Sequence, residues 1–144
     1  MKATLFSLAL CVFPPVAMAQ TTPLPEASLL LEMNSATDLP DEGCQLTMVS
    51  TNRLPHGLTR AAWQVAVFDS AGVVRYLPVL DFGALPMGKT KVAAFPLPGL
   101  SCTNISRIVV NDVAECRADD GTDLRDACLA ALATQTRGHI DFGL

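Results

Sequence analysis

The chain contains two histidines, His56 and His139, and these are its only imidazole groups. A histidine can serve as a general base near neutral pH, but nucleophilic catalysis also needs a positioned hydroxyl or thiol and a third group that orients the imidazole. His56 lies between Pro55 and Gly57, a pattern typical of a loop, and His139 falls on the expected outward face of the last strand. No Gly-x-Ser-x-Gly motif occurs. The sequence therefore predicts no catalytic residue, and we expect that the protein is not an enzyme.

Acidic side chains gather before the only convincing helical segment. Asp119, Asp120 and Asp123 could offer oxygen ligands to calcium, but their spacing differs from that of an EF-hand loop and no late bidentate Glu follows. Carboxylates before a helix also stabilise its positive N-terminal end, and Asp126 falls within the expected helix. Glycine-rich phosphate-binding loops are absent. The sequence therefore predicts no metal site and no cofactor.

Four cysteines remain once Cys11, in the N-terminal apolar segment, is set aside: Cys44, Cys102, Cys116 and Cys128. An even number in an exported chain favours two disulfides, and no Cys-x-x-Cys signals redox or zinc chemistry. Four cysteines allow three pairings. Cys116 and Cys128 flank the short acidic loop, so we expect them to pair locally and to leave Cys44 with Cys102, a link between distant strands.

The N-terminus has the pattern of a secretory signal peptide. Lys2 precedes an apolar run at 5–12, and Ala-Met-Ala ends at Ala19 in the small-x-small pattern of a cleavage site. About a dozen apolar residues, interrupted by two prolines, are too few to span a bilayer. We therefore expect a signal peptide at 1–19, a flexible leader at 20–26 and a periplasmic or secreted protein without stable membrane insertion.

Composition limits the remaining possibilities. The chain has 144 residues, of which 50% are hydrophobic and 17% charged, so we expect one folded domain at 27–144. The formal net charge is −4, and the ten basic residues are scattered along the chain. Because phosphate backbones bind clustered Lys and Arg, nucleic acid is not an expected partner. The expected partner is another exported protein.

The pattern of apolar residues indicates short strands around a central hairpin. Trp63, Val65 and Val67 alternate on one face, turn residues follow at 69–72, and a second strand returns at 73–77. We expect Trp63 and its aromatic neighbours in this hairpin to belong to the core. Further strands are expected at 29–33, 44–51, 89–97, 105–113 and 140–144, and one helix from an N-cap at Asp123 to about Thr134. About seven short strands favour a mainly β sandwich or barrel.

Two sets of residues also resemble known exported proteins. The first is Trp63-x-Val65-x-Val67-Phe68-Asp69-x-x-Gly72-x-Val74, followed by Phe82-x-x-Leu85-x-x-Gly88-x-Thr90. Residues 44–97 thereby resemble the FxLYD-type and fibronectin-III-like sandwiches of exported bacterial proteins. The end of the chain, 137–144, is similar to that of small uncharacterised exported proteins of alphaproteobacteria. The resemblance implies a single Ig-like, antiparallel β-sandwich with one short C-terminal helix, in the periplasm, and it carries over no catalytic residue.

Two functional hypotheses follow. The first is a non-catalytic protein-binding or structural module that acts through a sheet edge or a loop end. The second is a periplasmic enzyme or enzyme inhibitor that uses the acidic loop or the loop at 52–59. Inhibition predicts one exposed, rigid loop, whereas catalysis predicts a polar cleft that contains His56 or His139.

Overall fold

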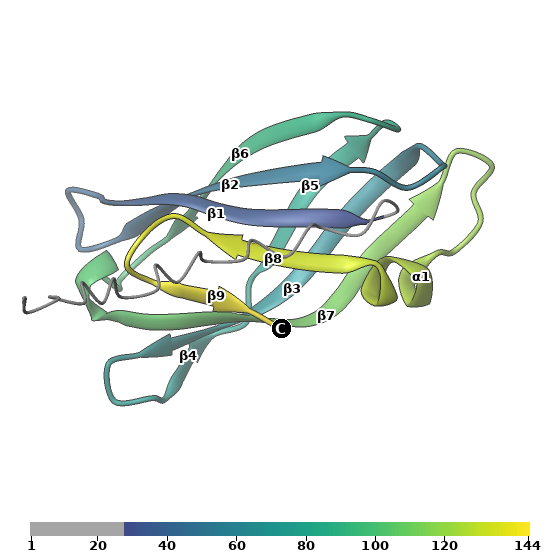
Figure 1. Ribbon diagram of the computed structural model, residues 1–144. Helices are drawn as coiled ribbons and strands as arrows, with labels where there is room; N and C mark the ends of the chain where they lie inside the picture. Colours follow the sequence, from purple (N-terminus) through teal and green to yellow (C-terminus); the bar gives the residue numbers. More distant parts are fainter. Residues whose placement is uncertain (1–27) are drawn as a thin grey trace, which may run out of the picture.

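A computed structural model describes residues 28–144 of the chain, so the predicted signal peptide at 1–19 and leader at 20–26 lie outside the described residues. Within 28–144 there are nine strands, one 3₁₀ turn and one short helix (Figure 1). In chain order these are β1 (Leu29–Asp38), β2 (Cys44–Asn52), β3 (Leu58–Asp69), β4 (Val74–Tyr76), β5 (Val79–Leu85), β6 (Thr90–Leu97), η1 (Cys102–Asn104), β7 (Ile105–Ala118), α1 (Arg125–Ala130), β8 (Leu132–Thr136) and β9 (Asp141–Gly143).

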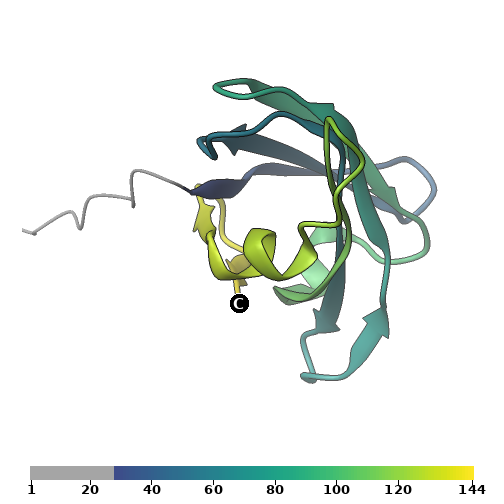
Figure 2. The same cartoon turned by 90° about the vertical axis from the view of Figure 1, so that its right-hand side faces the viewer.

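The strands form two sheets that pack together as a sandwich, seen from the side in Figure 2. The four-stranded sheet has the order β6-β2-β1-β8. The five-stranded sheet has the order β4-β3-β7-β9, and β5 also pairs with β3. The mainly β, sandwich-like architecture predicted from the sequence is therefore present, with more strands than the seven expected.

Both sheets are mixed, so the expected all-antiparallel sandwich is wrong. β8 runs parallel to β1, with Leu29 opposite Leu132, and β9 runs parallel to β7. The remaining pairs are antiparallel. The two parallel strands are the last in the chain, and each covers an edge strand that would otherwise have unpaired backbone groups.

The helix is shorter than predicted because its expected second half forms β8. α1 ends at Ala130, and the residues from Leu132 to Thr136 instead continue the four-stranded sheet, where pairing with β1 outweighs local helical spacing. The N-cap residue is Leu124 rather than Asp123. Asp123 Oδ1 accepts a 3.1 Å hydrogen bond from the Arg125 N–H, one position before the observed N-cap.

Several strand boundaries also differ from the expectation. β3 begins at Leu58, five residues before Trp63, and β7 continues to Ala118 rather than ending at Val113. Bulges let β7 continue past the polar residues Asn111 and Asp112. Residues 80–83, which are in none of the expected strands, are part of β5.

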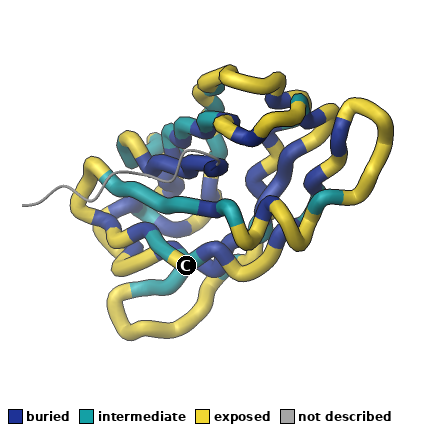
Figure 3. The backbone as a smooth tube through the Cα atoms, turned by 45° about the vertical axis from the view of Figure 1, so that its right-hand side comes forward, coloured by how far each residue is buried: buried dark blue, intermediate teal, exposed yellow. Residues whose placement is uncertain are grey.

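The core lies between the sheets and is formed by residues that alternate along the strands. Trp63, Val65 and Val67 are fully buried, as predicted. The Trp63 ring meets Phe82 edge-on at 5.7 Å between centroids, and Phe82 meets Phe95 at 5.3 Å, which links β3, β5 and β6. Figure 3 shows the exposed parts of the chain gathered in the loops and turns.

Two disulfides cross-link the sandwich, in the pairs expected from the sequence. Cys44 at the start of β2 is joined to Cys102 in η1, and Cys116 on β7 is joined to Cys128 on α1. Two disulfides in a small domain are typical of an oxidising location outside the cytoplasm. Among residues 28–144, no helix is long and apolar enough to cross a membrane.

Candidate binding surface at the loop end

Three connections meet at one end of the sandwich, which we call the loop end: the β2–β3 loop (53–57), the β5–β6 turn (86–89) and the β7–α1 loop (119–124). They border a shallow depression of about 470 Å³. Its lining residues are Pro55, His56, Gly57, Pro86, Met87, Ala118, Asp119 and Asp120. The two segments singled out in the sequence, the loop around His56 and the acidic loop, are thus neighbours in the fold.

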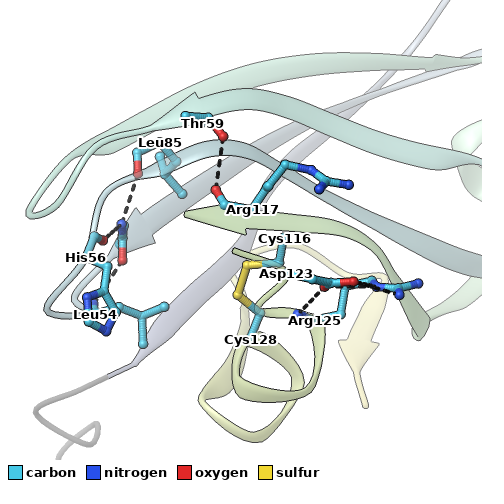
Figure 4. Close-up of a disulfide and its surroundings, with 10 residues drawn as sticks. Leu54, His56, Thr59, Leu85, Cys116, Arg117, Asp123, Arg125 and Cys128 are labelled. Carbon is cyan, nitrogen blue, oxygen red and sulfur yellow. Dashed lines mark hydrogen bonds and ion pairs between the residues drawn. A yellow bond between two sulfur atoms is a disulfide. The ribbon is translucent and has the colours of Figure 1, made fainter. Parts of the chain in front are cut away.

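The buried side chain of Asn52 holds the first two connections together. Asn52 has no exposed surface, and its Nδ2 donates 2.9 Å hydrogen bonds to the carbonyls of His56 and Leu85. Its Oδ1 accepts a 2.9 Å bond from the Leu54 N–H (Figure 4). All but one of the hydrogen-bonding positions of this amide are therefore satisfied by backbone groups of the loop and of the last residue of β5.

The backbone of Asn52 adds two further bonds to the turn. Its N–H donates to the Lys89 carbonyl at 3.0 Å, and its carbonyl accepts from the Gly88 N–H at 2.9 Å. Gly88 has a φ of 72°, a conformation that side-chain-bearing residues rarely adopt, so the glycine permits this return of the chain. One asparagine therefore sets the position of both connections.

The acidic loop is held by its own hydrogen bonds and by the neighbouring strand. The Thr122 N–H donates to Asp120 Oδ1 at 2.9 Å, and the Ala118 N–H donates to the Thr122 carbonyl at 2.9 Å. Thr59 Oγ1 donates to the carbonyls of Arg117 and Ala118 at 3.2 and 3.3 Å. The Cys116–Cys128 disulfide closes the connection from β7 to α1 (Figure 4). All three connections are thus fixed to the sandwich.

The charges of the loop end come from His56, Asp119 and Asp120. Hydrogen bonds from Thr122, first from its side chain and then from its backbone, hold the pKa of the Asp120 carboxyl below its ordinary value, and the nearby charge of His56 adds a smaller effect. Gly57 lies so close to the Asp119 carboxylate that a Cβ at position 57 would collide with it. The loop end is therefore a surface with two carboxylates beside one imidazole.

The other acidic residues lie apart from this depression. Asp123 forms a 2.8 Å ion pair with Arg125, and the hydrogen bond from Arg125 holds the pKa of the Asp123 carboxyl below its ordinary value. Asp123, Arg125 and Asp126 line a separate hollow at the start of α1. His139 precedes β9, is exposed, and is not among the residues that line the loop end.

Among the described residues, no hydrogen bond joins the His56 ring to a hydroxyl, thiol or carboxylate. Within the same part of the chain, no group of three or more His, Cys, Asp or Glu side chains is placed to hold a metal ion. Exposed apolar atoms beside fixed charges are suited to contact with another protein.

Sequence reasoning missed two contributors to the loop end. The sequence indicates Asn52 only as the first residue of the loop at 52–59, and it does not single out Met87, whose side chain is 64% exposed. The position of this methionine between Pro86 and Gly88 indicates an exposed apolar side chain, because a side chain in a tight turn is seldom buried. The link from Asn52 to β5 has no local signal, since the side-chain partner Leu85 lies 33 residues away in the chain.

Comparison of the chain with protein-family models, with curated proteins and with solved structures finds no match.

Proposed function

We propose that this chain is an exported, non-catalytic protein-binding module and that the loop end is its binding surface. The observation that carries this proposal is the fixation of three connections by Asn52 and by the Cys116–Cys128 disulfide. A surface that is already ordered loses little conformational entropy when a partner binds. Met87 lines the depression and offers a flexible apolar contact, and His56 and Asp119 offer polar contacts on the same surface.

The strand order supports an Ig-like assignment for the module. Strands one, two and six share one sheet, and strands three and seven share the other, as the A, B, E and C, F strands do in Ig-like sandwiches. In such modules the loops at one end of the sandwich commonly carry the binding surface. The last two strands depart from the Ig pattern because each runs parallel to its neighbour.

Export is supported by two independent features. The disulfides join all four cysteines of the described residues, which suits an oxidising compartment. The segment 1–19 has the composition of a signal peptide. N-terminal sequencing of the exported protein tests this part of the proposal: we expect Gln20 as the first residue, and an uncleaved chain would contradict it.

The binding surface is tested by affinity capture with crosslinking, using tagged 20–144 and an extracytoplasmic extract of the source organism. Met87→Glu alters a residue that lines the depression, and Leu144→Glu is its matched control, because the two side chains are 64% and 66% exposed. We expect a partner that is retained by the wild type and by Leu144→Glu but lost by Met87→Glu. A partner retained equally by both variants, or no reproducible partner, would contradict the proposal.

The rigidity of the β2–β3 loop also favours a second candidate function, inhibition of an extracytoplasmic hydrolase. The Asn52 side chain binds the His56 carbonyl and the Leu54 N–H of this loop and anchors it to the Leu85 carbonyl of β5, which holds the loop in one conformation, as an inhibitory loop requires. Labelling of the same extract with an active-site-directed hydrolase probe tests this function. Inhibition predicts that the protein suppresses labelling of one hydrolase and that His56→Asp restores it, and unchanged labelling at excess protein would rule inhibition out.

A further inference from the structure

Residues 132–144, which we call the strap, contribute one edge strand to each sheet (Figures 1 and 2). β8 pairs with β1 over five positions and β9 pairs with β7 over three, whereas β3 and β7 pair over eleven. Because β8 and β9 each have a strand partner on one side only, the strap is held by fewer backbone hydrogen bonds than the central strands.

The disulfide between Cys116 and Cys128 allows the strap to move without the helix. It holds α1 on β7, and the strap begins only a few residues later, at Leu132. Within the strap, Thr136 Oγ1 donates a 3.0 Å hydrogen bond to the Ile140 carbonyl, which stabilises the connection between β8 and β9. The strap can therefore separate from the sheets as one unit, with its hinge between Cys128 and Leu132.

The contacts that hold the strap are of two kinds. Its buried apolar side chains belong to the core, and they are Leu132, Ile140 and Phe142. Among residues 28–144, one side-chain hydrogen bond joins the strap to the rest of the molecule: Arg137 Nε donates to Glu32 Oε1 at 2.8 Å. The Arg137 N–H also donates to the Met33 carbonyl at 3.0 Å. Polar attachment of the strap is thus concentrated at Arg137.

Glu32 depends on Arg137 for its ionic partner. The residues opposite Glu32 on the neighbouring strands, Val49 of β2 and Gln135 of β8, are uncharged, and Asn34 of β1 donates a 2.9 Å hydrogen bond. The hydrogen bond from Arg137 lowers the pKa of the Glu32 carboxyl. The ion pair is therefore complete above the ordinary pKa, near 4.5, and is lost as the pH falls through the lower value of the folded state.

We propose that the strap opens as one unit while the rest of the sandwich stays folded, and that the ion pair between Glu32 and Arg137 is its latch. Opening removes one strand partner from β1 and one from β7, and it exposes the part of the core that Ile140 and Phe142 cover. Acid favours opening, because a protonated Glu32 no longer forms the ion pair. The loop end takes no part, so this proposal and the proposed function can fail independently.

Hydrogen exchange of backbone amides, measured by NMR on the folded chain 20–144 at pH 7, tests the proposal. Amides of the strap should exchange faster than those of β3 and depend less on added urea, since partial opening exposes less surface than global unfolding. Glu32→Gln keeps the size of the side chain and removes its charge, as protonation does. It should speed exchange of the strap amides about fivefold.

Leu80→Val is the matched control. Leu80 is fully buried on β5, which pairs with β3 on the side away from β7 and the strap. The substitution therefore destabilises the whole sandwich without a change at the latch. It should speed exchange of the β3 amides about fivefold and leave that of the strap amides within about twofold.

Three results would overturn the proposal. Equal exchange and equal urea dependence in the strap and β3 would mean that the strap opens only when the whole chain unfolds. The same conclusion would follow if Leu80→Val accelerated the strap amides as much as those of β3. Unchanged exchange of the strap in Glu32→Gln would show that the ion pair is not the latch.

Discussion

Asn52 has the greatest structural effect of any single polar residue at the loop end. It is a fully buried amide with three side-chain hydrogen bonds to the backbone, and it connects two loops that are distant in sequence. Buried polar groups stabilise a fold only when their partners are satisfied, and removal of one partner leaves the others without hydrogen bonds in a dry environment. The conformation of the loop end therefore depends on one residue that is itself fully buried.

Asn52→Ala is expected to lower the free energy of unfolding by about 2–4 kcal/mol, because the carbonyls of His56 and Leu85 and the Leu54 N–H lose their partner. Urea denaturation followed by tryptophan fluorescence measures this change. Asn111→Ala is the control, since its side chain is exposed and donates only to Gln64, and a change within about 0.5 kcal/mol is expected. Equal effects of the two substitutions would refute the role assigned to Asn52.

Glu32 is a second residue whose surroundings have a measurable consequence. Its side chain is 8% exposed, and Oε1 accepts a 2.8 Å bond from Arg137 Nε and a 2.9 Å bond from Asn34. The bond from Arg137 lowers the pKa of the Glu32 carboxyl, although burial acts in the opposite direction. A carboxyl with a depressed pKa in the folded state contributes stability above its ordinary pKa, near 4.5, and loses that contribution as the pH falls through the folded value.

Glu32→Gln is therefore expected to reduce stability by about 1 kcal/mol at pH 7, and the difference from the wild type should shrink below pH 4.5 as the wild-type carboxyl becomes protonated. Chemical denaturation at a series of pH values between 7 and 3 measures the difference. Asp141→Asn, at an exposed residue in no ion pair among the described residues, is the control. If the difference in unfolding free energy between the wild type and Glu32→Gln stays constant from pH 7 to pH 3, the dependence of stability on the ionisation of Glu32 is contradicted.

At the scale of elements, the edges of the two sheets are protected in different ways. On one side, β8 is the edge strand of the four-stranded sheet, and β9 is the edge strand of the five-stranded sheet. On the other side, β6 ends the four-stranded sheet, and Lys91 on β6 reaches across to β5, where its Nζ donates to the carbonyls of Phe82 and Ala84. A lysine directed inward at an edge satisfies backbone carbonyls and disfavours the addition of a further strand.

Lys91→Met keeps most of the apolar stem and removes the charge, so the two β5 carbonyls lose this donor. We expect a loss of about 1–2 kcal/mol in unfolding free energy and an increase in self-association. Denaturation and size-exclusion chromatography with light scattering measure the two effects. Lys89→Met, in the adjacent exposed turn, should change neither by a measurable amount. A monomeric Lys91→Met protein of wild-type stability would refute the bridging role.

At the scale of the whole molecule, the two disulfides restrict different parts of the chain. Cys44–Cys102 spans a sequence separation of 58 residues, and Cys116–Cys128 spans 12. The first joins the start of β2 to the residues before β7 and so encloses the central strands. The second holds α1 against β7 beside the loop end.

Replacement of Cys44 and Cys102 by Ala is expected to cost about 4 kcal/mol, and replacement of Cys116 and Cys128 about 3 kcal/mol, because the longer loop restricts the unfolded chain more. Urea denaturation of the two double variants measures the two losses of unfolding free energy and shows which is larger. Intact mass after alkylation of the exported protein without reductant is the accompanying test. Alkylation of two or more cysteines would refute the cross-linked sandwich.

Local patterns were sufficient to predict much of the fold. Alternating apolar residues marked β2, β6 and the buried face of β3, because a strand between two layers must place every second side chain in the core. The short separation of Cys116 from Cys128 indicated the pairs that the structure contains. These features depend on residues close together in the chain.

The remaining features depend on contacts between distant residues, which only the tertiary structure decided. Residues 132–134 were expected to complete the helix but instead form part of β8, which pairs in parallel with β1, and β9 pairs in parallel with β7. The loop end arose in the same way. His56 and Asp119 were recognised separately in the sequence, but their proximity depends on the pairing of β3 with β7, and the role of Asn52 depends on the carbonyl of Leu85.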